Sequence, residues 1–371
     1  MSKETPQDLI VKSAPHITGT MSKNRLMQYT FFALLAVTIV SAALWSQTTT
    51  VSGWNLGLTV GICALLAVGI AVGVDLLIGK VTSDSEVNTW SSAVFGLIVT
   101  LSYTLGTPSM NTETGLPVEA PLAFLYVGII SLLGILVFKK LMGLAGRKLV
   151  NPAAAAKFLV LLPTVTTTLL AIDHLKSGPL QVPSLAGGIS ALSVISGNGG
   201  AAFGSYIQGC YANPSTIASG MPDITSLMIL AKYHGWVGGA SSVAVIIAGV
   251  ALFILARKYI KWKITVSYLV AIAVLSLIFS FIFADGDLTT RLLFEVFMGS
   301  SIFLAFFMAT DPATTPFTSI GQIIFGVGLA ILTILIQTYL NFFGGALLAL
   351  LIMNLTVPLL DRVGIHKPFG R

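Results

Sequence analysis

Residues 54–79 of the chain read WNLGLTVGICALLAVGIAVGVDLLIG, an apolar run with a single charged residue, Asp75. The run is long enough to cross a lipid bilayer, because a spanning helix needs about 20 mostly apolar residues. The whole chain has the same character, since 55% of its 371 residues are hydrophobic and only 9% are charged. Soluble domains usually carry about 25% charged residues. The composition therefore predicts an all-α integral membrane protein with no large soluble domain.

Comparable apolar runs recur along the chain and indicate about ten transmembrane helices. They lie at about 27–45, 54–79, 90–106, 120–138, 151–172, 237–256, 264–284, 291–310, 320–340 and 343–360. The third run is short for a spanning helix, and residues 173–236 are too polar and Gly-rich to cross simply. We therefore expect one membrane domain over residues 27–360, between short tails at 1–26 and 361–371. Within it, residues 27–172 and 237–360 form two helical halves, and residues 173–236 form an outer-side loop region.

The basic residues predict which side of the membrane each connection faces. With the N-terminal tail in the cytoplasm, the inside segments hold sixteen Lys and Arg and the outside segments hold three. This asymmetry follows the positive-inside rule, and it predicts an even number of crossings with both ends in the cytoplasm. Basic residues distributed in this way mark a side of a lipid bilayer, so the net charge of +6 does not indicate a nucleic-acid partner.

Two similar steps stand at the cytoplasmic margins of the halves. The first is Asn151-Pro152-Ala153-Ala154, and the second is Asp311-Pro312-Ala313-Thr314-Thr315-Pro316. Proline lacks a backbone donor, and the residue before it avoids the helical region, so each step should break or cap a helix. Pro-broken helices in corresponding positions predict two inverted repeats around a midplane pathway. The alternative is that Asn151 and Asp311 only cap helices beside short loops.

Ionisable and polar groups near these breaks are the candidates for an ion pathway, because charge inside a membrane is costly unless it is paired or hydrated. We assign this role to Asp311, Asn151, Thr314 and Asp75. Asp75 also has a simpler interpretation, as has Lys157, since both lie near the expected inner margin and long side chains there reach toward water. Glu295 is a weaker candidate, one turn into the eighth run.

The chain contains no motif of a soluble enzyme. Gly197-Asn198-Gly199-Gly200 follows no predicted strand and precedes no Lys-Ser/Thr pair, so we interpret it as an outer loop. The two cysteines and four histidines lie far apart in sequence, which argues against a metal or iron–sulfur site in this chain. We therefore expect no catalytic or metal-ligating residue.

Several strings together resemble the NqrB/RnfD family of ion-translocating redox complexes. The most specific is FFMATDPATTP at residues 306–316, which is similar to the family's FFMATDPVTSP segment. Further matches are Ser13-Ala14-Pro15-His16-Ile17 before the first run, Asn151-Pro152-Ala153-Ala154, Trp262-Lys263-Ile264, and Met353-Asn354 with Pro358-Leu359-Leu360-Asp361. The resemblance covers about residues 13–362, and the short chain favours the RnfD side of the family.

The resemblance implies a flavin, FMN, linked by a phosphate ester to a threonine on the outer side. The best position is Thr225, between Asp223 and Ser226 in Met221–Leu227, within the outer-side loop region. Pro222-Asp223-Ile224 stands where the family has Ser-Gly-Ala before that threonine. The alternative is that Thr225 caps a short outer helix and that flavin is held without a covalent bond or is absent. A second, non-covalent flavin such as riboflavin is a further expectation.

The resemblance also implies a function. The chain would be a flavoprotein subunit of an ion-translocating oxidoreductase complex of the ferredoxin:acceptor type, in a prokaryotic cytoplasmic (inner) membrane. It would pass electrons between partner subunits, one of them a flavin-bearing outer-side subunit, coupled to Na⁺ or H⁺ movement. The alternative is a redox-silent transporter or channel of similar inverted-repeat fold.

Overall fold

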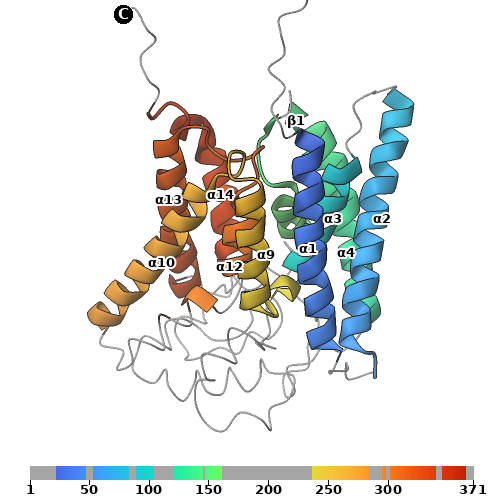
Figure 1. Ribbon diagram of the computed structural model, residues 1–371, viewed down its shortest axis with the longest axis horizontal. Coiled ribbons are helices and arrows are strands. Elements are labelled where there is room, and N and C mark those ends of the chain that lie inside the picture. Colours follow the sequence, from blue (N-terminus) through green and yellow to red (C-terminus); the bar gives the residue numbers. More distant parts are fainter. Residues whose placement is uncertain are drawn as a thin grey trace, which may run out of the picture.

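Figure 1 shows the computed structural model of the protein, in which two groups of helices stand side by side. The structure describes residues 22–46, 53–82, 89–103, 120–144, 147–160, 236–283, 292, 295–297, 301–339 and 345–364. Its described part is almost entirely helical, which confirms the predicted fold class. The only strands in this part are two short ones, β1 (Gly143–Leu144) and β2 (Arg147–Lys148), paired antiparallel.

The first group comes from the N-terminal half of the chain. It consists of α1 (Lys23–Trp45), α2 (Leu56–Thr82), α3 (Thr89–Ser102), α4 (Ala120–Leu133), its π-helical continuation η1 (Gly134–Leu141), and a further helical segment at 152–160. The second group comes from the C-terminal half. It consists of the 3₁₀ turn η4 (Val237–Gly239), α9 (Ser242–Leu255), α10 (Trp262–Phe283), α12 (Ser301–Phe303), the π-helical η5 (Leu304–Met308), α13 (Ser319–Tyr339) and α14 (Gly345–Leu360).

Local chemistry explains where helices begin. The hydroxyl of Ser22 accepts a hydrogen bond from the Arg25 N–H at 3.2 Å, so α1 starts at Lys23 and not near Met27 as its apolar run predicts. Ser241 caps α9 in the same way, accepting from the Ala244 N–H at 3.2 Å.

Length and apolar composition identify the helices that can cross a membrane. Four described helical segments are long and apolar enough: Lys23–Trp45, Leu56–Val81, Ala123–Leu141 and Ser319–Ile336. Many of their large apolar side chains face outward, among them Leu65, which is 77% exposed. An outward apolar surface of this kind suits lipid and not water. The membrane prediction is therefore confirmed, whereas the number of ten crossings stays a prediction.

Helix packing is similar in the two groups. In the first, α2 lies against α3 and α4, and in the second α13 lies against α10 and α14. The groups meet along α1 and α9, which lie side by side in Figure 1. Close approach requires a glycine at Gly96 of α3, where a Cβ atom would lie 2.7 Å from the Val68 Cα of α2.

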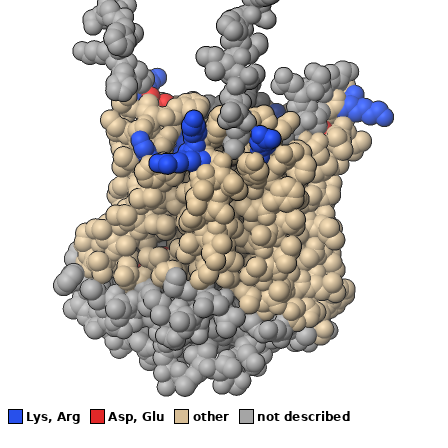
Figure 2. Space-filling view, viewed as in Figure 1, with Lys and Arg blue, Asp and Glu red and all other residues tan. Residues whose placement is uncertain are grey.

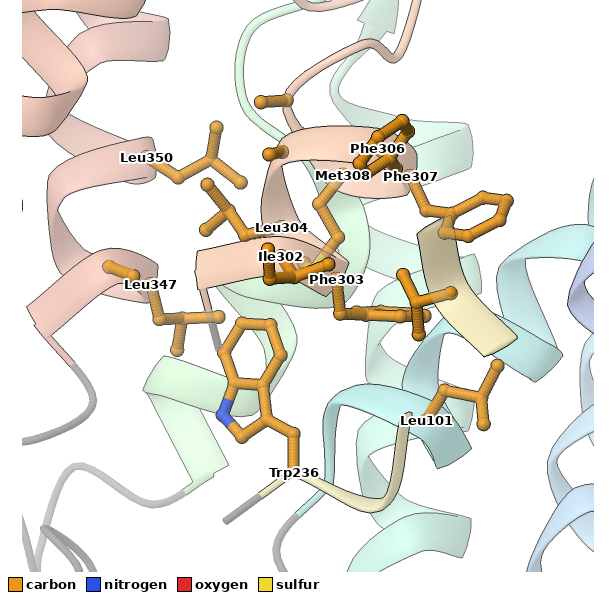
Figure 3. Close-up of a cluster of buried hydrophobic side chains, with 14 of the residues drawn as sticks. Leu101, Trp236, Ile302, Phe303, Leu304, Phe306, Phe307, Met308, Leu347 and Leu350 are labelled. Atoms are coloured by element: carbon orange, nitrogen blue, oxygen red, sulfur yellow. The ribbon is translucent and has the colours of Figure 1, made fainter. Parts of the chain in front are cut away.

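An aromatic core joins the groups behind this contact. Figure 3 shows Trp236 and Phe303 among the buried side chains that gather there, and their rings meet edge to face with centroids 6.1 Å apart. Phe303 also packs on Phe307, with ring centroids 5.5 Å apart. A backbone hydrogen bond of 2.9 Å from the Val237 N–H to the Tyr103 carbonyl ties the second group to the end of α3. This core fixes the ends of several helices relative to one another.

The basic side chains that are visible in Figure 2 gather at one end of the molecule, where α1 begins and α14 ends. We call this the basic end. The loop that contains Asp311 lies at the same end, because the Lys261 ammonium group donates to it and the Phe317 N–H donates to Asp361 after α14. This separation of charge is the one that the sequence predicts for the cytoplasmic side.

A polar junction as candidate ion-pathway site

The two Asx-Pro steps, which are far apart in the sequence, meet in the structure. The side-chain amide of Asn151 donates to the carbonyl oxygen of Met308 at 3.4 Å, at the end of η5. Beside it, the Lys148 N–H donates to the Ala313 carbonyl at 3.2 Å. The loop before the 152–160 helix therefore lies directly against the loop that follows η5.

Asn151 also caps its own helix. Its side-chain oxygen accepts hydrogen bonds from the N–H groups of Ala153 and Ala154, at 3.1 and 3.2 Å. These are two of the donors that the start of a helix leaves without a partner. Asn151 can therefore cap its helix and contact the second half at the same time, because its side-chain oxygen accepts from the helix and its side-chain NH₂ group donates to Met308.

Asn354 of α14 completes the contact between the halves. Its side-chain oxygen accepts from the Asn151 N–H at 2.9 Å, and its amide donates to the Thr314 carbonyl at 3.4 Å. Only 1% of Asn354 is exposed. Sequence reasoning did not select this residue as a site, although it is the only amide side chain in the apolar run 343–360. We call Asn151, Thr314 and Asn354 the polar junction.

The loop after η5 is held by its own hydrogen bonds. The Asp311 carboxylate accepts from the Ala313 N–H at 3.1 Å, and the Asp311 carbonyl accepts from the Thr315 hydroxyl at 2.7 Å. Lys261 donates to the Pro312 carbonyl at 3.2 Å and to the Thr315 carbonyl and hydroxyl at 2.8 and 2.7 Å. Several backbone oxygens that could bind a cation are therefore already engaged.

Thr314 differs from its neighbours in the loop. It is 1% exposed, and its hydroxyl has no hydrogen-bond partner among the residues that the structure describes. A buried polar group without a partner is costly, so such a hydroxyl is a place where a bound ion or water would be favourable. Together with the half-buried Asp311 carboxylate, it gives this loop hard oxygen ligands of the kind that Na⁺ or a protonated water would use.

Asp75 belongs to a separate network in the first group. Its carboxylate accepts from the Ser92 hydroxyl at 2.5 Å and forms an ion pair with Lys140, also at 2.5 Å. Lys139 donates to the same Ser92 hydroxyl at 2.6 Å. The structure therefore brings Asp75 together with α3 and η1, and not with the polar junction. Its assignment to the ion pathway stays a prediction.

Lys157 does not extend toward water as the sequence suggested. It is 6% exposed, donates to the Ser102 carbonyl at the end of α3, and lies 4.6 Å from the centroid of the Trp236 ring. Among the described residues, no carboxylate forms an ion pair with Lys157. An ammonium group on a carbonyl and an aromatic face is partly compensated, but it remains an expensive group at this depth.

Glu295 is the second carboxylate that the structure buries, with 2% exposed. Its backbone carbonyl accepts from the Ser301 hydroxyl at 3.1 Å, and the Tyr268 hydroxyl lies 3.5 Å from the same Ser301 oxygen. This polar contact joins α10 to the start of α12 and stands apart from the polar junction.

The expected flavin site falls outside the described residues. Thr225, Asp223 and Ser226 belong to the segment between residues 160 and 236, of which the structure describes nothing. No group of three or more potential metal ligands occurs in the described ranges, and Cys63 is buried there as a free thiol.

The comparison with known families adds to this geometry. The model of the NQR2, RnfD, RnfE family matches residues 10–370, which is nearly the whole chain. The chain belongs to this family. The resemblance that the sequence strings suggested is thereby confirmed, and the polar junction is built from three of the strings that carried it, at Asn151, at residues 306–316 and at Asn354.

Relatives within the family are similar over almost their full length. The D subunit of the Na⁺-translocating ferredoxin:NAD⁺ oxidoreductase complex of Acetobacterium woodii is 26% identical, over 98% of this chain and 96% of its own. The D subunit of the ion-translocating oxidoreductase complex of Shewanella amazonensis is 29% identical, over 97% of each chain. The D subunit of the proton-translocating ferredoxin:NAD⁺ oxidoreductase complex of Clostridium ljungdahlii is 25% identical, over 97% and 96%.

Proposed function

We propose that this chain is the RnfD-type membrane subunit of an ion-translocating oxidoreductase complex of the ferredoxin:acceptor type. The observation that carries the proposal is the polar junction, at which the two Pro-broken segments of a family member meet between its two helical groups. Broken helices in corresponding halves are the usual place of an ion site in membrane transporters. Substrate oxidation would belong to partner subunits, because the chain lacks motifs for dinucleotide or iron–sulfur binding.

The ion pathway that we propose passes the loop of Asp311 and Thr314. Asp311 would supply negative charge, and the buried Thr314 hydroxyl would supply a neutral oxygen ligand. The relatives at 26% and 25% identity are named for Na⁺ and for protons, respectively, so both ions need to be assayed.

We further propose that the chain carries FMN through Thr225 on the outer side and works beside a flavin-bearing outer-side subunit. A flavin supplies one- and two-electron exchange when it is bound. The support is the family membership together with the position of Thr225 in the loop region that the charge asymmetry predicts to lie outside. A second, non-covalent flavin and the placement of both chain ends in the cytoplasm belong to the same proposal.

In-gel fluorescence tests the flavin. The complex is purified, denatured in SDS and separated, and this subunit is inspected for flavin fluorescence, with Thr225→Val as the comparison. We expect fluorescence in the natural subunit and none in the variant. Fluorescence that persists in Thr225→Val would place the linkage elsewhere. The absence of both covalent and released flavin would favour a redox-silent transporter. Released but not covalent flavin would mean that Pro222-Asp223-Ile224, in place of Ser-Gly-Ala, prevents the covalent link.

Ion uptake tests the pathway independently of the flavin. Proteoliposomes that contain the complex are supplied with reduced ferredoxin, and Na⁺ and H⁺ uptake are followed. We expect Asp311→Asn to abolish uptake of the coupling ion. Thr310→Val is the control, because the Thr310 hydroxyl donates to the Phe306 carbonyl of the preceding turn, at 2.7 Å, and so belongs to its own helix. Equal uptake by both variants would exclude Asp311 from the pathway.

A further inference from the structure

A group of lysines surrounds the Asp75 network at the basic end of the first group. Lys139 and Lys140 are consecutive residues of η1. Lys139 donates to the Ser92 hydroxyl, and Lys140 forms an ion pair with the Asp75 carboxylate, to which that hydroxyl donates. In an α-helix, neighbouring side chains diverge by about 100°. η1 has the wider turn of a π-helix, and the two ammonium groups contact the same Ser92–Asp75 pair.

Two further lysines add to the positive charge at this point. Lys23 stands at the start of α1 and Lys148 in β2, and the charges of both act on Lys139. We call Lys23, Lys139, Lys140 and Lys148 the lysine cluster. Among the described residues, Asp75 is the only acidic group that acts on Lys139. Both oxygens of that carboxylate are engaged, one by Ser92 and one by Lys140. The cluster therefore has an excess of positive charge that the described residues do not neutralise.

Apolar side chains project outward next to the cluster. Leu76 and Leu77 directly follow Asp75 on α2, and Leu141 directly follows Lys140 on η1. They are 50%, 65% and 77% exposed, respectively. Cationic groups at the end of an apolar helical surface match the two parts of an anionic phospholipid, its phosphate and its acyl chains.

We propose that the lysine cluster binds the phosphate headgroup of an anionic phospholipid, whose acyl chains lie along the exposed apolar side chains of α2 and η1. Lys139 is the central ligand, because its ammonium group donates to Ser92 at 2.6 Å and the charges of the other three lysines act on it. A free phosphate ion would use the same ammonium groups, but it would gain nothing from Leu76, Leu77 and Leu141. The proposal is independent of the flavin and of the coupling ion.

Thermal unfolding of the full-length chain in detergent tests the proposal. The probes are phosphatidylglycerol, phosphatidylcholine at the same concentration, and inorganic phosphate. We expect phosphatidylglycerol alone to raise the unfolding midpoint. Lys139→Gln should weaken the apparent affinity for this lipid about fivefold, since each cationic side chain near a membrane surface contributes about 1 kcal/mol to binding anionic lipid.

Matched variants distinguish this site from general attraction to the basic end. Lys263→Gln is the control, because Lys263 belongs to the second group and donates to the Ser319 hydroxyl at 2.7 Å. We expect Lys263→Gln and the charge-conserving Lys139→Arg to respond to phosphatidylglycerol as the natural chain does. Equal weakening in Lys139→Gln and Lys263→Gln would overturn the proposal, and so would an equal response to inorganic phosphate. The proposal would also be overturned if the natural chain did not respond to phosphatidylglycerol and the chain with Asp84→Asn and Glu86→Gln did. Those two acids, outside the described residues, would then be the groups that neutralise the lysines.

Discussion

At the scale of single residues, Asn354 of the polar junction links the two Asx-Pro steps through one side chain. Its side-chain oxygen accepts from the Asn151 N–H in the first half of the chain, and its side-chain NH₂ group donates to the Thr314 carbonyl in the second half. Asn354→Leu would leave both groups buried without that partner. We expect a loss of about 2–4 kcal/mol in the free energy of unfolding, because an unsatisfied buried backbone group costs about 1–3 kcal/mol.

Thr356→Val provides the control for this substitution on the same helix. The Thr356 hydroxyl donates to the Met353 carbonyl, within its own helix, at 2.8 Å. Its loss should change the free energy of unfolding by less than about 1 kcal/mol. Reversible unfolding in detergent measures both variants, and similar losses in the two would show that Asn354 contributes no more than an ordinary hydrogen bond within a helix.

In contrast to Asn354, the charge of Lys157 is expected to destabilise the fold. A buried ammonium group loses several kcal/mol of hydration free energy, and the contacts with the Ser102 carbonyl and the Trp236 ring offset only part of this loss. We expect Lys157→Met, similar in volume, to unfold at the same temperature as the natural chain or higher. Lys157→Ala should unfold at a lower temperature because it leaves a cavity. If Lys157→Met unfolds as early as Lys157→Ala, the charge itself stabilises the fold.

At the scale of elements, the contact between α2 and α3 depends on close backbone approach at Gly96. A Cβ atom there would lie 2.7 Å from the Val68 Cα and 2.8 Å from the Ala67 carbonyl oxygen. Backbone atoms cannot move aside as a flexible side chain does, so we expect Gly96→Val to lower the free energy of unfolding by about 1–3 kcal/mol. Gly69→Val on α2 is the control, because a Cβ at Gly69 meets nothing within 4 Å. Equal effects on unfolding would refute the close-packing argument.

The ion pair of Asp75 and Lys140 joins α2 to η1 and can be measured as a coupling energy. Lys140 is 26% exposed, whereas Asp75 is 2% exposed, so removal of Lys140 alone leaves a buried carboxylate with less compensation. We expect a double-mutant cycle of Asp75→Asn and Lys140→Met to give a coupling of about 1–3 kcal/mol in the free energy of unfolding. A coupling near zero would mean that Ser92 and the remaining lysines compensate fully.

Hydropathy predicts the elements well where a helix is long and faces lipid, and poorly where a helix is interrupted. α1, α2 and α13 lie on their apolar runs because outward-facing residues must be apolar along the whole crossing. The described α3 has 14 residues, about 21 Å at 1.5 Å per residue, and ends before residue 106 of its run. The π-helical turns η1 and η5 had no signal in the sequence, because they depend on packing against neighbouring helices and not on local composition.

At the scale of the whole molecule, the sequence identified Asn151 and Asp311 as special but not the way in which they are connected. Proline after an Asx residue marks a helix boundary in any fold, so the local signal was strong. The hydrogen bond from Asn151 to Met308 spans 157 positions of the chain and exists only once both halves are packed. From the sequence, Lys261 is only one inside charge, because nothing in its neighbourhood predicts the contact with Thr315 by which it holds the Asp311 loop.

The orientation of the whole molecule in the membrane follows from the side that the basic end faces. The described helices place the start of α1 and the end of α14 at the same basic end, which agrees with an even number of crossings. If that end faces the cytoplasm, the segment after the fifth apolar run faces outside. In a background of Cys63→Ser and Cys210→Ser, we expect a membrane-impermeant thiol reagent to label Ser177→Cys in intact cells or spheroplasts. Gly370→Cys should be labelled only after the membrane is broken. Labelling of Gly370→Cys in intact cells would place the basic end outside, against the positive-inside rule, and would remove the outer-side position that the Thr225 proposal requires.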